Sequence, residues 1–158
     1  MTALQVYRDD GPLARWAERR LGTPADEHPL AWIVPPLLRA VEYGCVITLT
    51  AFADRDAMPA CFAFLGVLAF HHYDTVYRLR QQHIAPPAWV QAVGGGWEVR
   101  ILLVCAFALA GVLELGLLAV TVALALIYVT ESTRSWVVYG RDEHPRAPED
   151  EQEIENAE

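Results

Sequence analysis

A continuous apolar stretch from about Val99 to Tyr139 constrains the fold of this chain more than any other feature of its sequence. It covers about 40 residues, or roughly 60 Å as a helix, whereas about 20 residues cross a hydrocarbon core. Two glycines and Glu114 lie near its middle and favour an exposed turn. We therefore predict two helices joined by a tight turn at Gly111–Gly116, with one long tilted helix as the alternative.

Two further apolar stretches run from about Leu30 to Ala53 and from about Ala57 to Leu79. Pro35 and Pro36 lie in the first turns of one, and Pro59 opens the other, where proline is tolerated because those amides have no partner in the helix. The sequence thus predicts an all-α integral membrane bundle of about four transmembrane helices, or three if the long stretch is undivided.

The connection before the long stretch contains two breaker clusters. Ala85–Pro86–Pro87 and Gly94–Gly95–Gly96 predict a loop there, and tryptophans at 89 and 97 suggest that the loop lies along the membrane interface.

Charge placement predicts the orientation of the bundle. The chain has 158 residues, with 12 basic side chains, all arginine, and 20 acidic ones. Ten of the twelve arginines fall on one side of a four-span bundle, which predicts an inner-membrane protein with both termini in the cytoplasm. Eight acids lie in residues 142–158, so we predict a disordered acidic tail over residues 141–158. The chain has no basic stripe, and no nucleic-acid partner is expected.

The first 28 residues have no apolar core of a signal peptide. Within them, Leu13, Trp16, Ala17 and Leu21 share one helical face beside several arginines. We predict a cytoplasmic segment over residues 1–28 whose amphipathic helix lies on the inner membrane surface, followed by the bundle over residues 29–140.

Charged and polar side chains recur inside the spans, three or four residues apart. Each set occupies one helical face and falls in the inner half of the bilayer, so we expect the faces to surround a cavity that opens to the cytoplasm. The sets are Arg39 with Glu42, His71 with Asp74 and Arg78, and Glu131 with Arg134.

These residue types suit a phosphorylated lipid head group. The predicted substrate-binding residues are Arg39, Arg78, Arg134 and His72. The predicted catalytic residues are Asp74, His71, Glu131 and Glu42, which could act as a general base or hold a divalent metal such as Mg²⁺. The alternative is that all these groups form structural ion pairs.

A short segment at Asp10–Arg15, followed by Gly22 and Asp26, is similar to the signature of CDP-alcohol phosphatidyltransferases. In that family four aspartates bind two metals. This chain has Tyr7 and Leu30 at two of the four positions, and its spacer is six residues instead of eight. We therefore expect no catalysis by this segment.

A second resemblance covers residues 5–140 and is carried by Tyr7–Ala17, His28–Arg39 and Glu42–Gly44. These runs resemble an uncharacterised actinobacterial membrane domain that typically follows nucleotidyltransferase and CDP-alcohol phosphatidyltransferase domains in one polypeptide. The resemblance implies a partner in phospholipid head-group synthesis and transfers no catalytic residues.

Three hypotheses for the function follow. The leading one is an accessory or lipid-handling module that acts beside a CDP-alcohol phosphatidyltransferase domain or protein and binds membrane lipid. The second is a small membrane enzyme that uses the Asp, Glu and His cluster with a divalent metal. The third is a scaffold whose polar groups hold helices together, or hold protomers together in a homo-oligomer.

Overall fold

A computed structural model of the chain describes residues 7–21, 31–81 and 83–143. All regular structure in these ranges is helical, which confirms the predicted all-α class. The chain divides into two units, residues 1–128 and 129–158, and each is described by itself. Most of the predicted acidic tail lies outside the described residues.

The predicted amphipathic helix is present as α2, Pro12–Leu21. Pro12 opens it, where a missing amide hydrogen costs nothing. Leu13 and Trp16 are exposed, and Arg19 and Arg20 fill its last turn. The expected position of this helix on a membrane surface stays a prediction.

The first two predicted spans form a helical hairpin. A 3-10 turn at Ala31–Ile33 leads into α3, Val34–Ala53, which carries proline in its first positions as predicted. A second 3-10 turn at Arg55–Ala57 leads into α4, Met58–Gln81. The side chain of Asp54 accepts a hydrogen bond of 3.1 Å from the amide of Asp56 and fixes the turn.

The predicted loop before the long apolar stretch is wrong in part. Ala88–Gly94 is a short helix, α5, which begins directly after Pro87. Gly95 ends it in the left-handed conformation at φ 72°, and α6, Gly96–Ala110, follows at once. The glycines therefore form a joint between two helices, because a residue without a Cβ adopts this conformation at little cost.

The long apolar stretch is divided where the sequence predicted. Gly111 ends α6 at φ 70°, and the amide of Val112 donates to the carbonyl of Phe107 at 3.0 Å. The next helix, α7, begins at Leu113 and continues to Glu143. Two helices joined by a tight turn are confirmed, but the turn is shorter than the predicted Gly111–Gly116, because Glu114 and Gly116 lie within α7. One undivided helix is excluded.

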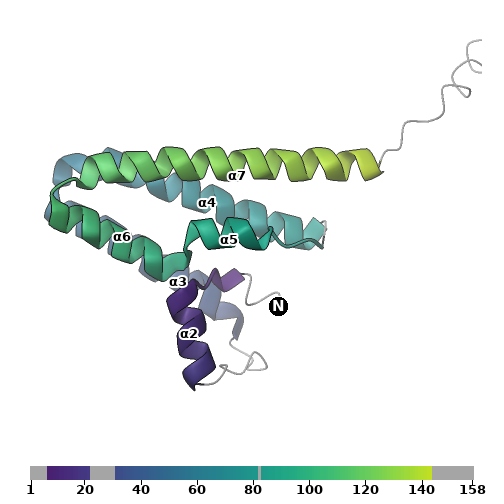
Figure 1. Cartoon of the computed structure of the whole chain (residues 1–158), viewed down its shortest axis with the longest axis horizontal. Helices are drawn as coiled ribbons and strands as arrows, with labels where there is room; N and C mark the ends of the chain where they lie inside the picture. Colours follow the sequence, from purple (N-terminus) through teal and green to yellow (C-terminus); the bar gives the residue numbers. More distant parts are fainter. Residues whose placement is uncertain (1–6, 22–30, 82, 144–158) are drawn as a thin grey trace, which may run out of the picture. The chain divides into compact units, whose positions relative to one another are not determined.

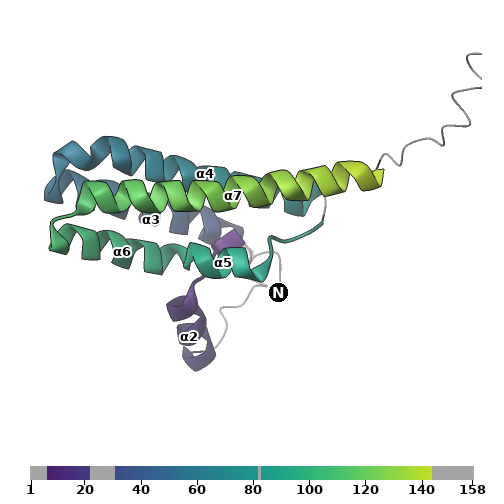
Figure 2. The ribbon, with the colours of Figure 1, turned by 45° about the horizontal axis from the view of Figure 1, so that its top comes forward.

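Within residues 1–128, α3, α4, α6 and the first part of α7 run alongside one another (Figures 1 and 2). These helices pack around an apolar core, and each of them contributes buried side chains to it. Its fully buried members include Val46, Phe64, Leu68, Val104 and Leu117.

Three helical stretches are long and apolar enough to cross a membrane: Ala31–Ala53, Ala88–Ala110 and Leu113–Arg141. The predicted second span, α4, is long enough, but the polar run that begins at His71 lowers its mean hydropathy. The multi-pass character is therefore supported by three helices.

In the second unit, the described residues 129–143 are the continuation of α7. Glu131 and Arg134 both lie on it, and the rings of Trp136 and Tyr139 meet edge to face at 5.9 Å.

Candidate functional site

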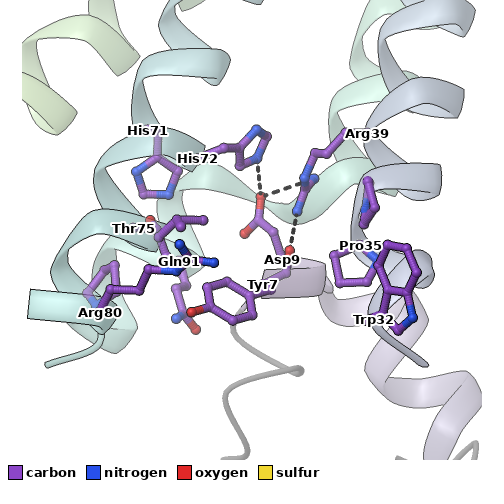
Figure 3. A pocket seen from close by; sticks show the side chains of 13 residues that line it. Tyr7, Asp9, Trp32, Pro35, Arg39, His71, His72, Thr75, Arg80 and Gln91 are labelled. Carbon is purple, nitrogen blue, oxygen red and sulfur yellow. Dashed lines mark hydrogen bonds and ion pairs between the residues drawn. The ribbon is translucent and has the colours of Figure 1, made fainter. Parts of the chain in front are cut away.

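A cavity of about 470 Å³ lies where α3 begins and α4 ends (Figure 3). The N-terminal arm, defined here as residues 7–11, and the segment around α5 complete its wall. Trp32, Pro35, Val76 and Pro86 make part of the lining apolar, and Arg39 and Arg80 make part of it cationic. The full lining is Tyr7, Asp9, Trp32, Pro35, Pro36, Arg39, His71, His72, Thr75, Val76, Arg80, Pro86 and Gln91.

Asp9 is the acidic member of this lining, and its carboxylate faces donors from three helices. Its Oδ2 atom lies 2.8 Å from Nη2 of Arg100, 3.4 Å from Nε2 of His72 and 3.9 Å from Nη1 of Arg39. Figure 3 shows it between His72 and Arg39. One carboxylate oxygen thus joins α3, α4 and α6 to the arm.

The surroundings of Asp9 keep its carboxyl group ionised. Burial raises its pKa, but the hydrogen bond with His72 and the charges of Arg100 and Arg39 lower it by more, so the pKa lies well below its ordinary value. The backbone of Asp9 is left-handed, at φ 51°, a conformation that aspartate tolerates better than most residues. The arm therefore places a fixed negative charge in the cavity wall.

A second layer of charge lies behind Asp9. Glu42 is fully buried and accepts from Arg39 Nη1 through Oε2 at 2.9 Å and from Arg100 Nε through Oε1 at 2.5 Å. The Arg100 side chain is only 3% exposed, and its Nη1 donates to the carbonyl of Gly94 at 3.1 Å. Two acids and two arginines thus form a neutral network, the four-residue network of Asp9, Arg39, Glu42 and Arg100.

Both histidines of α4 lie in the cavity lining. His72 has Asp9 at one ring nitrogen and the hydroxyl of Tyr43 at the other, 3.0 Å away. The ring of His71 stacks on Tyr128 of α7 with centroids 3.9 Å apart. His72 is therefore held in orientation by hydrogen bonds, and His71 by ring packing.

The arm and α2 are fixed to the bundle through Glu98 of α6. Its carboxylate accepts hydrogen bonds of 3.1 Å from the amides of Gly11, Leu13 and Ala14. These are amides at the start of α2 that have no partner in their own helix, and a negative charge there also suits the helix dipole. Glu98 is thus the cap of a helix more than 80 residues away in sequence.

Gly11 and Gly96 let the arm approach α6 backbone to backbone. A Cβ atom at Gly11 would overlap the carbonyl oxygen of Gly95 and the carboxylate of Glu98. A Cβ atom at Gly96 would overlap the backbone of Gly11. Any larger residue at position 11 must therefore displace the arm.

The structure brings together only part of the predicted site. Three predicted residues, Arg39, His71 and His72, line the cavity, and Glu42 lies behind them in the network. Asp74 and Arg78 are absent from the lining and pair with each other at 2.9 Å. Glu131 and Arg134 belong to the second unit. Their predicted roles stay predictions.

The hypothesis of a metal cluster finds no support in the described residues, which contain no group of three or more His, Cys, Asp or Glu side chains suited to hold a metal ion. Both carboxylate oxygens of Glu42 accept from arginines. That geometry suits a residue that positions the two arginines.

Sequence reasoning missed Asp9, Glu98 and Arg100. The predicted orientation takes ten of the twelve arginines as lying on one side of the membrane, but Arg100 lies inside the bundle, where Glu42 and Asp9 neutralise it. One signal was available: Arg100 stands one residue inside the apolar stretch, where an unpaired charge is costly. For Asp9, the sequence contains one hint. Asp9 lies in Tyr7–Ala17, a run that carries the resemblance to the actinobacterial membrane domain, but that resemblance assigns no role to any residue.

Comparison with known proteins yields one match. A family described as a family of unknown function (DUF5941) matches residues 17–154, which is most of the chain. No curated protein and no solved structure matches the sequence significantly.

Proposed function

This chain belongs to the DUF5941 family of unknown function, and we propose that it is a multi-pass membrane protein that binds a phosphorylated lipid head group in the cavity between α3 and α4. One observation carries the proposal: the cavity joins a cationic wall to an apolar one. A phospholipid has the same two parts, a phosphate and a hydrocarbon region.

The cationic wall includes a side chain that is available to a ligand. Arg80 is exposed at the cavity and, among the described residues, has no ion-pair partner. Arg39 and His72 face the same space, although Asp9 engages both. An arginine can give a phosphate group two parallel hydrogen bonds, each stronger than a neutral one.

The apolar wall suits the glycerol and first acyl carbons of a lipid. Trp32 is exposed at the start of α3, where an aromatic ring is favoured at a membrane interface. Pro35 and Val76 also belong to the lining. A soluble phosphate ester would leave this wall without a partner.

We include α4 as a fourth crossing. It packs against α3, and a short turn joins the two helices. If α3 spans the membrane, α4 therefore crosses it beside α3. Its polar residues His71 and Asp74 are buried, while Phe62, Phe70 and Tyr73 are exposed. The low hydropathy of α4 thus comes from its inward face, and its outward face suits lipid. With four crossings and the arginines inside, the cavity opens toward the cytoplasmic leaflet.

The partner we propose is a CDP-alcohol phosphatidyltransferase, which makes phosphorylated lipids. The support is the sequence resemblance to a domain that follows such enzymes in one polypeptide. The present chain would then hold the lipid substrate or product of its partner. Membranes that contain such an enzyme should form product faster with this chain present, and an unchanged rate would refute the partnership.

A structural scaffold is the second candidate, because the four-residue network is internally neutral and nearly saturated with contacts. Such a network holds helices together without any ligand. The two candidates differ in whether lipid is retained.

The test is retention of anionic lipid by the full chain in detergent, measured by native mass spectrometry with phosphatidic acid and phosphatidylcholine as probes. We expect preferential retention of phosphatidic acid. Arg80→Gln should lower its affinity about tenfold, the effect of losing one charge-assisted hydrogen bond. Arg55→Gln, at an exposed arginine in the turn before α4, is the matched control and should change nothing. Equal retention of both lipids, or no effect of Arg80→Gln, would favour the scaffold.

A further inference from the structure

The carboxylate of Asp9 occupies a position that resembles a bound anion. Its donors come from the bundle, on α3, α4 and α6, whereas Asp9 itself comes from the arm. Convergent donors from arginine and histidine are the usual receptor for a phosphate oxygen. The side chain of Asp9 is 9% exposed, so the position is shielded from water.

The bundle without Asp9 carries an excess of positive charge at this point. Arg39 and Arg100 contribute two positive charges, and Glu42 contributes one negative charge that contacts both arginines. Glu42 is fully buried and the Arg100 side chain is 3% exposed. A buried net charge is costly, so the bundle requires an anion at this position.

The arm that delivers Asp9 is held mainly by polar contacts. Arg39 Nη2 donates to the carbonyls of Tyr7 and Arg8 at 3.0 and 2.9 Å, and Glu98 accepts from the amide of Gly11 at 3.1 Å. Water or a ligand can replace hydrogen bonds of this kind, so their net contribution to stability is much smaller than their strength in isolation. The apolar core, which holds the bundle, does not involve the arm.

The cavity gives a ligand direct access to this position. Asp9, Arg39 and His72 all line it, and Arg100 lies directly behind Asp9. We propose that Arg39, His72 and Arg100 form an anion site which the Asp9 carboxylate fills in this structure, and that a phosphate group of the ligand takes its place when the arm withdraws. This inference deepens the proposed function and rests on it for the class of ligand.

The first test removes the tethered anion. Asp9→Asn keeps the size of the side chain and deletes its charge, so the affinity of the full chain for inorganic phosphate should rise about tenfold. Phosphorus NMR of the phosphate in the presence of the detergent-solubilised protein measures this. Asp56→Asn, at an exposed acid in the turn before α4, is the matched control and should leave the affinity unchanged. Addition of Arg39→Gln to Asp9→Asn should abolish the gain.

The second test displaces the arm and leaves every donor in place. Gly11→Ala puts a methyl group where the backbone of Gly95 and the carboxylate of Glu98 lie, so it should also raise phosphate affinity. Gly44→Ala is the matched control, since a Cβ atom there meets nothing within 4 Å. If Asp9→Asn and Gly11→Ala both bind inorganic phosphate and phosphatidic acid no better than the unmodified chain, the inference is wrong.

A third measurement needs no substitution. Saturating phosphatidic acid should accelerate hydrogen exchange at the amide of Gly11, because the ligand displaces the arm. Slower or unchanged exchange would contradict the inference.

Parallel titrations identify the recognised group. A gain in Asp9→Asn for both inorganic phosphate and phosphatidic acid assigns recognition to the phosphate alone, and a gain for the lipid only assigns it to the whole head group. Both results support the site.

The two proposals also fail separately. Retention of phosphatidic acid that depends on Arg80, without any gain of affinity in the arm variants, keeps the proposed function and removes this inference. A phosphate gain with no dependence on Arg80 does the reverse.

Discussion

The two ends of the helical unit formed by residues 1–128 are closed in different ways. At the turn end, α3 meets α4 and α6 meets α7 through short connections (Figure 1). The contacts there are local: the amide of Asp54 donates to Thr50 at 2.9 Å, and that of Val112 donates to Phe107. At the arm end, the contacts join groups such as Asp9 and Arg100, which are 91 residues apart.

The difference teaches where buried charge can persist in such a bundle. A short turn satisfies its own backbone and needs no charged partner. The arm end instead gathers ionised groups from the arm, α3 and α6, and each is stable only while the others are in place. We therefore expect substitutions at the arm end to act on several segments at once, and those at the turn end to act on one pair of helices.

The largest expected effect is at Arg100. Arg100→Met leaves Glu42 and Asp9 without their shared cation, and breaking a buried pair in this way costs about 3–5 kcal/mol. Unfolding of the purified protein by increasing SDS, followed by circular dichroism, measures this loss. Addition of Glu42→Gln should restore part of the stability, because it removes one of the two unpaired acids. A loss below about 1 kcal/mol would mean that the network is solvated.

A smaller effect is expected at the turn end. A Cβ atom at Gly116 would lie 2.5 Å from Cγ of Phe107, so Gly116→Ala must push α7 away from α6. Overpacking of this kind costs about 1–3 kcal/mol. The same SDS titration measures the effect, with Gly44→Ala as the comparison without a clash, because a Cβ atom there meets nothing within 4 Å. Lipid retention by the folded protein should stay unchanged, and its loss would show that the two ends are coupled.

Most helix boundaries of this unit were predictable from the sequence because their signals are local. Proline at the start of α3 and near the start of α4, and glycine after α6, mark helix ends through backbone geometry alone. The same reasoning failed at α5, because Pro87 and Gly95 flank a helix only seven residues long. Breaker residues mark boundaries without saying what lies between them.

The arm end was only half predictable. Helical spacing correctly placed Arg39 and Glu42 on one face, and their hydrogen bond confirms that pairing. Helical spacing could not predict the other partners of these two residues. Asp9 and Arg100 reach them, and Glu98 reaches the arm, only after four helices have packed. The resemblance at residues 7–17 singled out the arm, but its acids serve as partners of arginine in the structure.

The most subtle expected effect is the pH dependence of arm docking. Because the pKa of Asp9 is lowered when the arm is docked, the undocked arm binds more protons as the pH falls below the ordinary value of 3.8. Docking is therefore fully stabilised above about pH 4 and weakens as the pH falls further toward the pKa of the docked state. Hydrogen exchange at Gly11 and Leu13, relative to amides in the middle of α6, measures this.

Asp10 works in the opposite sense and supplies the control. Burial raises its pKa, although Arg8 and the indole of Trp97 partly offset this, so docking gains stability as Asp10 becomes protonated. Asp10→Asn should therefore make the acid loss of docking steeper, whereas Asp9→Asn should remove it. If docking of the arm in Asp9→Asn still weakens as much at low pH, the carboxylate of Asp9 is not what holds the arm. The contrast between the two ends would then rest on Glu98.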